Sequence, residues 1–167
     1  MKKLVMMMLV TVMMLGAVFG QAFADENRLG VGANYWVTID DLDSDVDDNG
    51  FSWLISYQRR SGIFTIELDG ELLPDRFGET AFAPEIYLLV GGAIYAGAGI
   101  GIVYSDDSFA DEPFFALRVG FDLEFLPGLH LDLSGNYRFN DTCDLKDDDA
   151  DIDTDTVFLG AALRVEL

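Results

Sequence analysis

Cysteine, histidine and basic residues are scarce in this sequence of 167 residues. It contains one cysteine, Cys143, and one histidine, His130. A single cysteine cannot form an intramolecular disulfide, and one Cys with one His falls short of the ligand sets that usually hold zinc or haem. Ten lysines and arginines stand against 30 acidic residues, which gives a formal net charge of −20. This charge argues against nucleic-acid binding, because such binding needs a basic surface.

The first 24 residues have the pattern of a secretory signal. Lys2 and Lys3 precede an apolar stretch over residues 4–19, and the small-x-small sequence AFA at 22–24 precedes Asp25. The pattern predicts a signal peptide over residues 1–24, which is cleaved, and an exported domain over residues 25–167. An uncleaved anchor is the alternative, but the apolar stretch is short for a membrane span. The exported part has the length of one domain.

After residue 24, no stretch long enough for a helix has apolar residues spaced with a helical period. Instead, apolar and polar residues alternate with a period of two in eight segments, as in strands that have two different faces. In the segment 114–125, for example, Phe115, Leu117 and Val119 alternate with Arg118 and Gly120. The eight predicted strands are 28–39, 51–60, 63–72, 82–90, 93–105, 114–125, 129–140 and 156–167.

The predicted strands are joined alternately by short and long connections. The short ones are Ser61–Gly62, Gly91–Gly92 and the sequence LPG at 126–128, all typical of tight hairpin turns. The long ones are polar and cover 40–50, 73–81, 106–113 and 141–155. Short turns at one end and long loops at the other are typical of bacterial outer-membrane barrels.

A soluble lipocalin-like barrel or a β-sandwich would show the same alternation, with its apolar face turned inward. Three features favour an apolar face turned toward lipid. The segments are longer than the usual soluble strand of five or six residues. Aromatic residues of the apolar face gather near strand ends, where the two membrane interfaces would lie. The polar face carries charges of both signs together with glycines such as Gly97, Gly99 and Gly101, which would make room for long charged side chains inside a narrow barrel.

From Arg28 to Leu167 the pattern resembles the small eight-stranded outer-membrane barrels of the OmpA transmembrane-domain and OmpX type. The resemblance is one of architecture and implies an all-β fold, an eight-stranded antiparallel up-and-down transmembrane β-barrel in the cell outer membrane of a Gram-negative bacterium. It further implies a monomer whose partners are outer-membrane lipid and lipopolysaccharide, and the barrel-assembly machinery during biogenesis. Such proteins usually end in an aromatic residue, whereas this chain ends in RVEL; Leu167 keeps the apolar alternation that the machinery would read.

The polar face predicts a network of charged side chains inside the barrel. Buried charges are costly unless they are paired, so we expect salt bridges and hydrogen bonds among them. One interpretation is a polar plug that fixes the fold; the other is a narrow path for ions or small solutes gated by these pairs, as in a porin-like channel. The predicted network contains Glu67, Asp69, Glu71, Glu85, Arg118, Asp122, Asp132, Arg138 and Arg164.

The sequence HLDLS at 130–134 is the place to look for catalysis, because some small outer-membrane barrels are enzymes that use His with Ser. His130 and Ser134 share a face but are four strand steps apart, about 13 Å at 3.3 Å per residue. A base and its nucleophile must lie within about 3 Å of each other. We therefore expect a protein that is not an enzyme, acting through envelope integrity or surface interaction.

Aspartates crowd two of the long connections. The stretch DVDDNG at 45–50 matches the first half of a calcium loop, but an EF-hand needs flanking helices and an acid at its twelfth position, which here is Ser56. Either these loops form a solvated anionic surface, or they bind divalent cations weakly at several sites, since clustered carboxylates suit Ca²⁺ or Mg²⁺. No other cofactor is expected. The candidate ligands are Asp43, Asp45, Asp47, Asn49, Asp149, Asp151 and Asp153.

Overall fold

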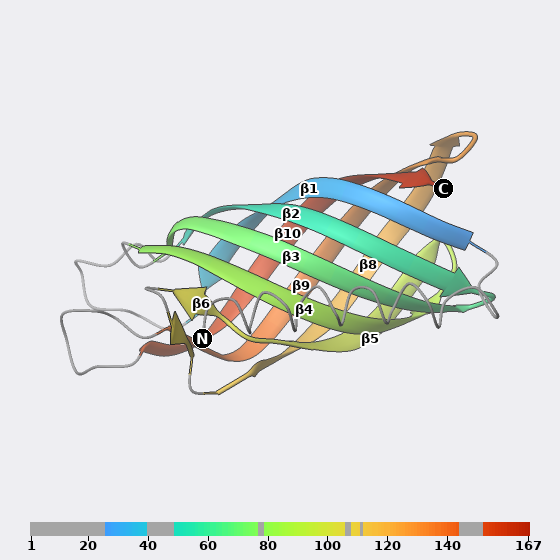
Figure 1. Ribbon diagram of the computed structural model, residues 1–167. Coiled ribbons are helices and arrows are strands. Elements are labelled where there is room, and N and C mark those ends of the chain that lie inside the picture. The colour runs from blue at the N-terminus through green and yellow to red at the C-terminus, as the bar shows by residue number, and fades with distance from the viewer. Residues whose placement is uncertain (1–25, 40–48, 77–78, 106–107, 111, 144–151) are drawn as a thin grey trace.

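The computed structural model describes residues 26–39, 49–76, 79–105, 108–110, 112–143 and 152–167, and these form β-strands and turns (Figure 1). Eight strands make up the wall, and two short ones, β6 (Tyr104–Ser105) and β7 (Ser108–Phe109), extend one end. The wall strands are β1 (Glu26–Thr38), β2 (Asn49–Ser61), β3 (Phe64–Arg76), β4 (Glu79–Gly91), β5 (Ile94–Gly101), β8 (Phe114–Leu126), β9 (Leu129–Cys143) and β10 (Ile152–Glu166).

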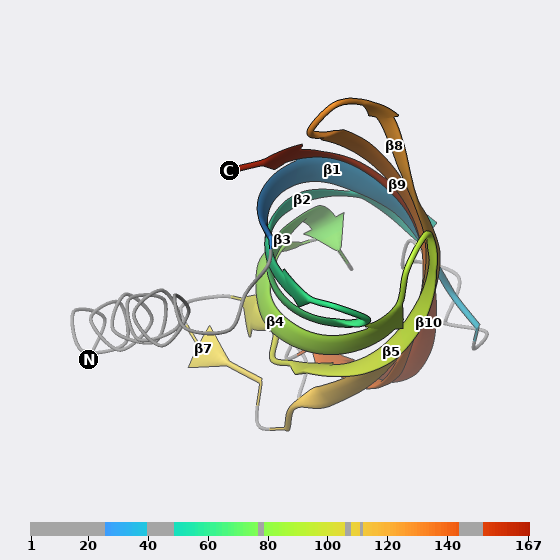
Figure 2. The same cartoon turned by 90° about the vertical axis from the view of Figure 1, so that its right-hand side faces the viewer.

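The wall strands close into a barrel. Each pairs antiparallel with its neighbours in the order β3, β2, β1, β10, β9, β8, β5, β4, and β3 pairs with β4 to complete the ring. The first and last strands meet along one seam, with Arg28 paired to Glu166 at one end and Thr38 to Thr156 at the other. Figure 2 shows the ring nearly end-on. The predicted fold class is therefore confirmed.

Three tight turns gather at one end of the barrel, which we call the short-turn end; the opposite end is the long-loop end. The turns connect β2 to β3, β4 to β5 and β8 to β9, as predicted. Gly62 (φ 59°) and Gly128 (φ 72°) hold two of these turns in the left-handed region, which a residue with a Cβ rarely adopts.

Several predicted strand ends are wrong. The predicted loop 141–155 is shorter, because β9 continues to Cys143 and β10 begins at Ile152. The strand predicted over 93–105 ends at Gly101, and Tyr104 pairs instead in β6 with Phe82 and Phe109. A physical reason is Pro84, which has no N–H to donate to the ladder beyond the Glu85–Gly101 pair. The predicted loop 73–81 is mostly strand, because Leu73 pairs with Ala81 and both side chains are buried.

The two faces of the wall are inverted relative to a soluble protein. Large apolar side chains point outward along the strands; Val31, Val119 and Leu159 are 63%, 60% and 62% exposed. The charged side chains of Arg138 and Arg164 are 1% exposed. A continuous apolar surface of this kind is unfavourable in water and suits a lipid environment, so the soluble-barrel alternative is rejected. Among the described residues, no helix is long and apolar enough to cross a membrane.

Candidate functional site

The interior of the barrel holds the polar groups that the sequence places on one face. Nearest the long-loop end, the Nη2 of Arg138 on β9 forms ion pairs with Glu71 on β3 and, at 2.6 Å, with Glu85 on β4. Asn34 and Ser52 also donate hydrogen bonds to Glu71. The carboxylate of Glu71 is thus surrounded by donors from β1, β2 and β9.

Two further arginines converge on Glu67 in the middle of the barrel. Arg164 on β10 lies 2.6 Å from Glu67 and 2.6 Å from Asp132, and Arg118 on β8 lies 3.2 Å from the other oxygen of Glu67. Arg118 also donates to Asp69 at 2.8 Å. Glu67 therefore links arginines that come from two different strands and neutralises part of the charge of each.

Smaller polar groups complete this middle layer. Gln58 donates to Glu67 at 2.9 Å, and the Tyr95 hydroxyl donates to Asp132 at 2.8 Å. Arg118 also donates to the side chain of Asn136. These neutral partners satisfy some of the donors and acceptors that the ion pairs do not use, as buried polar groups require.

A third group of charges lies near the short-turn end. Asp122 on β8 forms ion pairs with Arg28 on β1 and, at 3.2 Å, with Arg60 on β2. The other oxygen of Asp122 lies 3.1 Å from Nδ1 of His130 on β9. Arg28 also contacts Glu26, so this group joins residues from β1, β2, β8 and β9.

Aromatic side chains share the interior with the charges. The guanidinium of Arg138 lies 3.8 Å from the ring centroid of Phe158 and 4.6 Å from that of Phe114, and Arg118 lies 3.7 Å from the ring of Tyr87. Cation–π contacts of this kind are favourable where water is excluded. Phe114, Phe158 and Tyr87 are at most 1% exposed.

Two of the inner-face glycines make room for these rings. A Cβ on Gly99 would lie 2.4 Å from the Tyr87 ring, and one on Gly101 would lie 2.4 Å from the Phe114 ring and 2.8 Å from Glu85. The expectation that such glycines accommodate charged side chains therefore covers only part of their role. Aromatic rings are the larger occupants.

All nine residues of the predicted network lie on the inner face, and the structure brings each of them into an ion pair. Sequence reasoning left out Arg28, which is 3% exposed, and the hydrogen-bond donors Asn34, Ser52 and Tyr95. The sequence contained the information needed to place Arg28 and Asn34 inside, because both residues alternate with Leu29 and Tyr35 of the outer face.

Most of the predicted cation ligands lie outside the described residues: Asp43, Asp45, Asp47, Asp149 and Asp151. Asp153 lies in β10, and its side chain is not described. Asn49 begins β2 with an exposed side chain, whose oxygen accepts a hydrogen bond from the Tyr35 hydroxyl at 3.2 Å. Cation binding by the loops remains a prediction.

The two residues considered for catalysis have separate surroundings. His130 faces Asp122, whereas Ser134 pairs with Gly160 and Gly120 further along the barrel. Its hydroxyl oxygen lies 3.0 Å from the position that a Cβ on Gly160 would take. These surroundings match the spacing argument against a His–Ser dyad.

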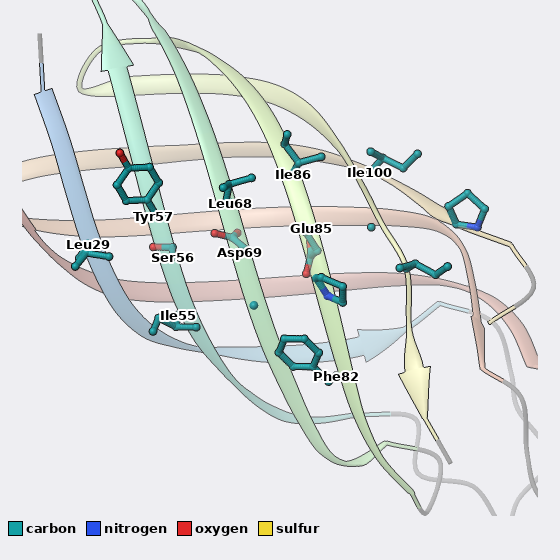
Figure 3. Close-up of a pocket in the computed structure, with 15 residues that line it drawn as sticks. Leu29, Ile55, Ser56, Tyr57, Leu68, Asp69, Phe82, Glu85, Ile86 and Ile100 are labelled. Atoms are coloured by element: carbon teal, nitrogen blue, oxygen red, sulfur yellow. The ribbon is translucent and has the colours of Figure 1, made fainter. Parts of the chain in front are cut away.

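A groove of about 570 Å³ crosses the outer wall over β1 to β5. Figure 3 shows Ile55, Phe82, Ile86 and Ile100 around it, while the carboxylates of Asp69 and Glu85 belong to the inner face. Gly70 and Pro84 form a backbone pair among its lining residues, and neither carries a long side chain. Its apolar lining lies within the lipid-facing band, where acyl chains would fill it.

The architecture matches solved outer-membrane barrels. Neisserial surface protein A aligns with a TM-score of 0.60 and 15% identity over 85% of this chain and 96% of its own. The outer membrane protein AlkL, studied in lipid bilayers, aligns with a TM-score of 0.54 and 13% identity over 87% of this chain and 91% of its own. The N-terminal β-barrel domain of Pseudomonas aeruginosa OprF aligns with a TM-score of 0.52 and 10% identity over 84% of this chain and 97% of its own. The sequence matches no protein-family model and no curated protein.

The fold and the inverted faces define the class: the protein is a small eight-stranded transmembrane β-barrel of the outer-membrane type. The structural likeness spans nearly the whole described chain, and the predicted recognition of this class is confirmed. The location that goes with this class is the cell outer membrane, as predicted.

Proposed function

We propose that the protein is a closed, non-enzymatic outer-membrane barrel that acts through envelope integrity or surface contacts rather than through conduction or chemistry. The observation that carries this proposal is the position of Arg138. Its side chain is buried between Phe158 and Phe114 and pairs with two carboxylates on the far wall. A side chain held in this way blocks the interior near the long-loop end.

The layers below Arg138 support the same conclusion. Arg164 and Arg118 cross the lumen to Glu67 and Asp69, and each is at most 3% exposed. An eight-stranded barrel has an interior just wide enough for side chains to fill. Among the side chains buried there are those of four arginines and five aromatic residues, which favours a polar plug over an ion path: Arg28, Arg118, Arg138 and Arg164, with Trp36, Tyr87, Tyr95, Phe114 and Phe158.

The acidic loops suggest how such a barrel would act at the surface. Short turns typically face the periplasm and long loops the exterior, so the aspartate-rich connections would lie beside lipopolysaccharide. Both surfaces are anionic and would repel each other unless divalent cations bridge them. We include weak Ca²⁺ or Mg²⁺ binding at the loops, and a monomeric state, in the proposal.

Conductance in planar bilayers tests the plug against the porin-like alternative. The folded barrel should give no single-channel steps above the bare bilayer, and Arg138→Gln or Arg118→Gln should lower stability without opening a path. Arg59→Gln, at a half-buried arginine on β2 away from these pairs, is the control for the loss of one positive charge. Defined conductance steps in the parent chain, or steps that grow in the two lumen variants alone, would overturn the plug.

A further inference from the structure

A small cluster of metal-binding groups lies at the short-turn end, apart from the loops discussed above. The side chains of Glu26 on β1, His130 on β9 and Glu166 on β10 place one ligand atom each within 4.8 Å of one another. Nε2 of His130 is 3.9 Å from Oε1 of Glu26. The three residues are far apart in sequence and meet only because the barrel closes.

His130 provides the observation that points to a ligand. The residue is 5% exposed, and its Nε2 has no hydrogen-bond partner. A buried ring nitrogen without a partner is costly, because the group has lost its water without replacement. This nitrogen lies 3.9 Å from Oε1 of Glu26, and a carboxylate oxygen of Glu166 completes the cluster, so an ion bound by all three residues would satisfy it.

The other ring nitrogen fixes how Nε2 can act. Nδ1 of His130 lies 3.1 Å from Oδ1 of Asp122. An ionised carboxylate only accepts hydrogen bonds, so Nδ1 carries the proton and donates it. In the neutral ring Nε2 then presents its lone pair. Carboxylate–histidine pairs of this kind orient histidines that bind metals and increase their basicity.

The backbone holds the third ligand in place. Glu166 pairs with Arg28 across the seam, and its N–H donates to the carbonyl of Gly128 at 2.9 Å. Gly128 belongs to the turn that immediately precedes His130 in β9. Figure 1 shows the end of β10 beside β1. The side chain of Glu166 is exposed, which leaves an open side for a water ligand.

We propose that Glu26, His130 and Glu166 bind one divalent transition-metal ion of the Zn²⁺ type. One imidazole nitrogen with two carboxylates suits such an ion, whereas Ca²⁺ and Mg²⁺ prefer oxygen ligands alone. Bonds of about 2 Å put neighbouring ligand atoms about 3 to 4 Å apart, close to the present His130–Glu26 spacing. Arg28 does not block the site, because a carboxylate has lone pairs for both a guanidinium and a metal.

The consequence is a cross-link at the closing seam. The ion would join the first strand, the last strand and the neighbour of the last strand. It would bind the closed barrel and not the unfolded chain, where the three residues are separated, and would therefore stabilise the closed form. The sequence argument against zinc counted only cysteine and histidine ligands. In this cluster, two glutamate carboxylates supply the ligands that the single histidine lacks.

The single histidine allows a specific test. Selective isotope labelling of histidine gives the imidazole signals of His130 alone, so metal bound at the acidic loops does not report. Titration of the folded chain in detergent micelles with Zn²⁺ should shift the Nε2 signal with a one-to-one end point. A tenfold excess of Mg²⁺ should not reproduce the shift.

Two variants complete the test. Glu166→Gln, at an exposed side chain, should weaken the Zn²⁺-dependent shift of His130 by about tenfold or more in dissociation constant, since one of three ligands is lost. Glu112→Gln is the control for the loss of one exposed carboxylate, because Glu112 lies before β8 at the long-loop end and is not a member of the cluster; its titration should match the parent chain. An unshifted Nε2 signal at saturating Zn²⁺, or equal affinity in Glu166→Gln and the parent chain, would overturn the site.

Discussion

Arg138 on β9 and Glu71 on β3 form an ion pair across the full width of the barrel. Their strands are four places apart in either direction around the ring, so the pair spans its diameter. Both side chains are at most 1% exposed. An interaction between opposite walls ties together strands that share no backbone hydrogen bonds. The stability of the barrel should therefore depend on this pair more than on any surface ion pair.

Arg138→Gln is expected to destabilise the barrel strongly. It leaves Glu71 and Glu85 buried beside each other without their cation, and removing one partner of a buried pair typically costs about 3–5 kcal/mol. The free energy of unfolding can be measured by urea titration in detergent or lipid, using the mobility difference between boiled and unboiled samples as the readout. Arg59→Gln is the control. An equal, small effect of the two changes would show that the Arg138 pairs contribute little.

A double-mutant cycle can separate the interaction energy between Arg138 and Glu71 from the cost of leaving one of them buried without its partner. We expect Arg138→Gln with Glu71→Gln to be less destabilising than the sum of the two single changes, with a coupling energy of about 1–3 kcal/mol. The reason is that the second change removes the carboxylate that the first leaves unpaired. Urea titrations of the four proteins give this energy directly. Additive effects would mean that the two groups do not interact in the folded barrel.

Asp69 and Glu67 should respond differently to neutralisation. Glu67 contacts Arg118, Arg164 and Gln58, whereas Asp69 contacts Arg118 through one oxygen and its other oxygen has no hydrogen-bond partner. Asp69→Asn should therefore leave the free energy of unfolding unchanged or increase it. Glu67→Gln should lower it by about 3 kcal/mol or more, because two buried arginines lose a partner. Both values come from the same urea titration, and the opposite order would contradict these assignments.

Much of the fold was predictable because period-two alternation fixes which residues face inward. Once Phe115 and Leu117 are placed outside, Arg118 must lie inside, and the short turns fix which strands are neighbours. The ends of strands were less predictable. Leu73 and Ala81 continue the β3–β4 ladder although polar neighbours favour a loop, and the interruption after Gly101 depends on Pro84 in a different strand.

The pairing inside the barrel was only partly predictable. Alternation identifies the charged residues of the inner face, but which carboxylate each arginine meets depends on the stagger of the strands. Arg118 on β8, for example, forms ion pairs with Glu67 and Asp69 on β3, and the alternation alone does not single out these two carboxylates. The Glu26–His130–Glu166 cluster depends on the register at the seam, which no local pattern specifies.

Gly99→Ala is expected to destabilise the barrel by overpacking. The added Cβ would lie 2.4 Å from the Tyr87 ring and 2.7 Å from the carbonyl oxygen of Ile86, so the wall must shift. Overpacking of this kind typically costs about 1–3 kcal/mol. Gly135→Ala is the matched control, because its Cβ would meet its nearest atoms at 3.9 Å and 4.0 Å. Urea unfolding should separate the two variants, and equal stabilities would show that the Tyr87 ring can move aside freely.

A charge on the outer face tests the lipid-facing orientation directly. Val119 lies near the middle of β8 and is 60% exposed, whereas Leu126 ends the strand and is 55% exposed. In a soluble barrel, Arg at either exposed position would change stability little. In a bilayer, Val119→Arg should cost about 2–4 kcal/mol and Leu126→Arg about 0–1 kcal/mol, because the penalty for a charge falls from the midplane to the interface. Reversible unfolding from lipid vesicles measures both, and equal costs for the two variants would contradict a membrane midplane at Val119.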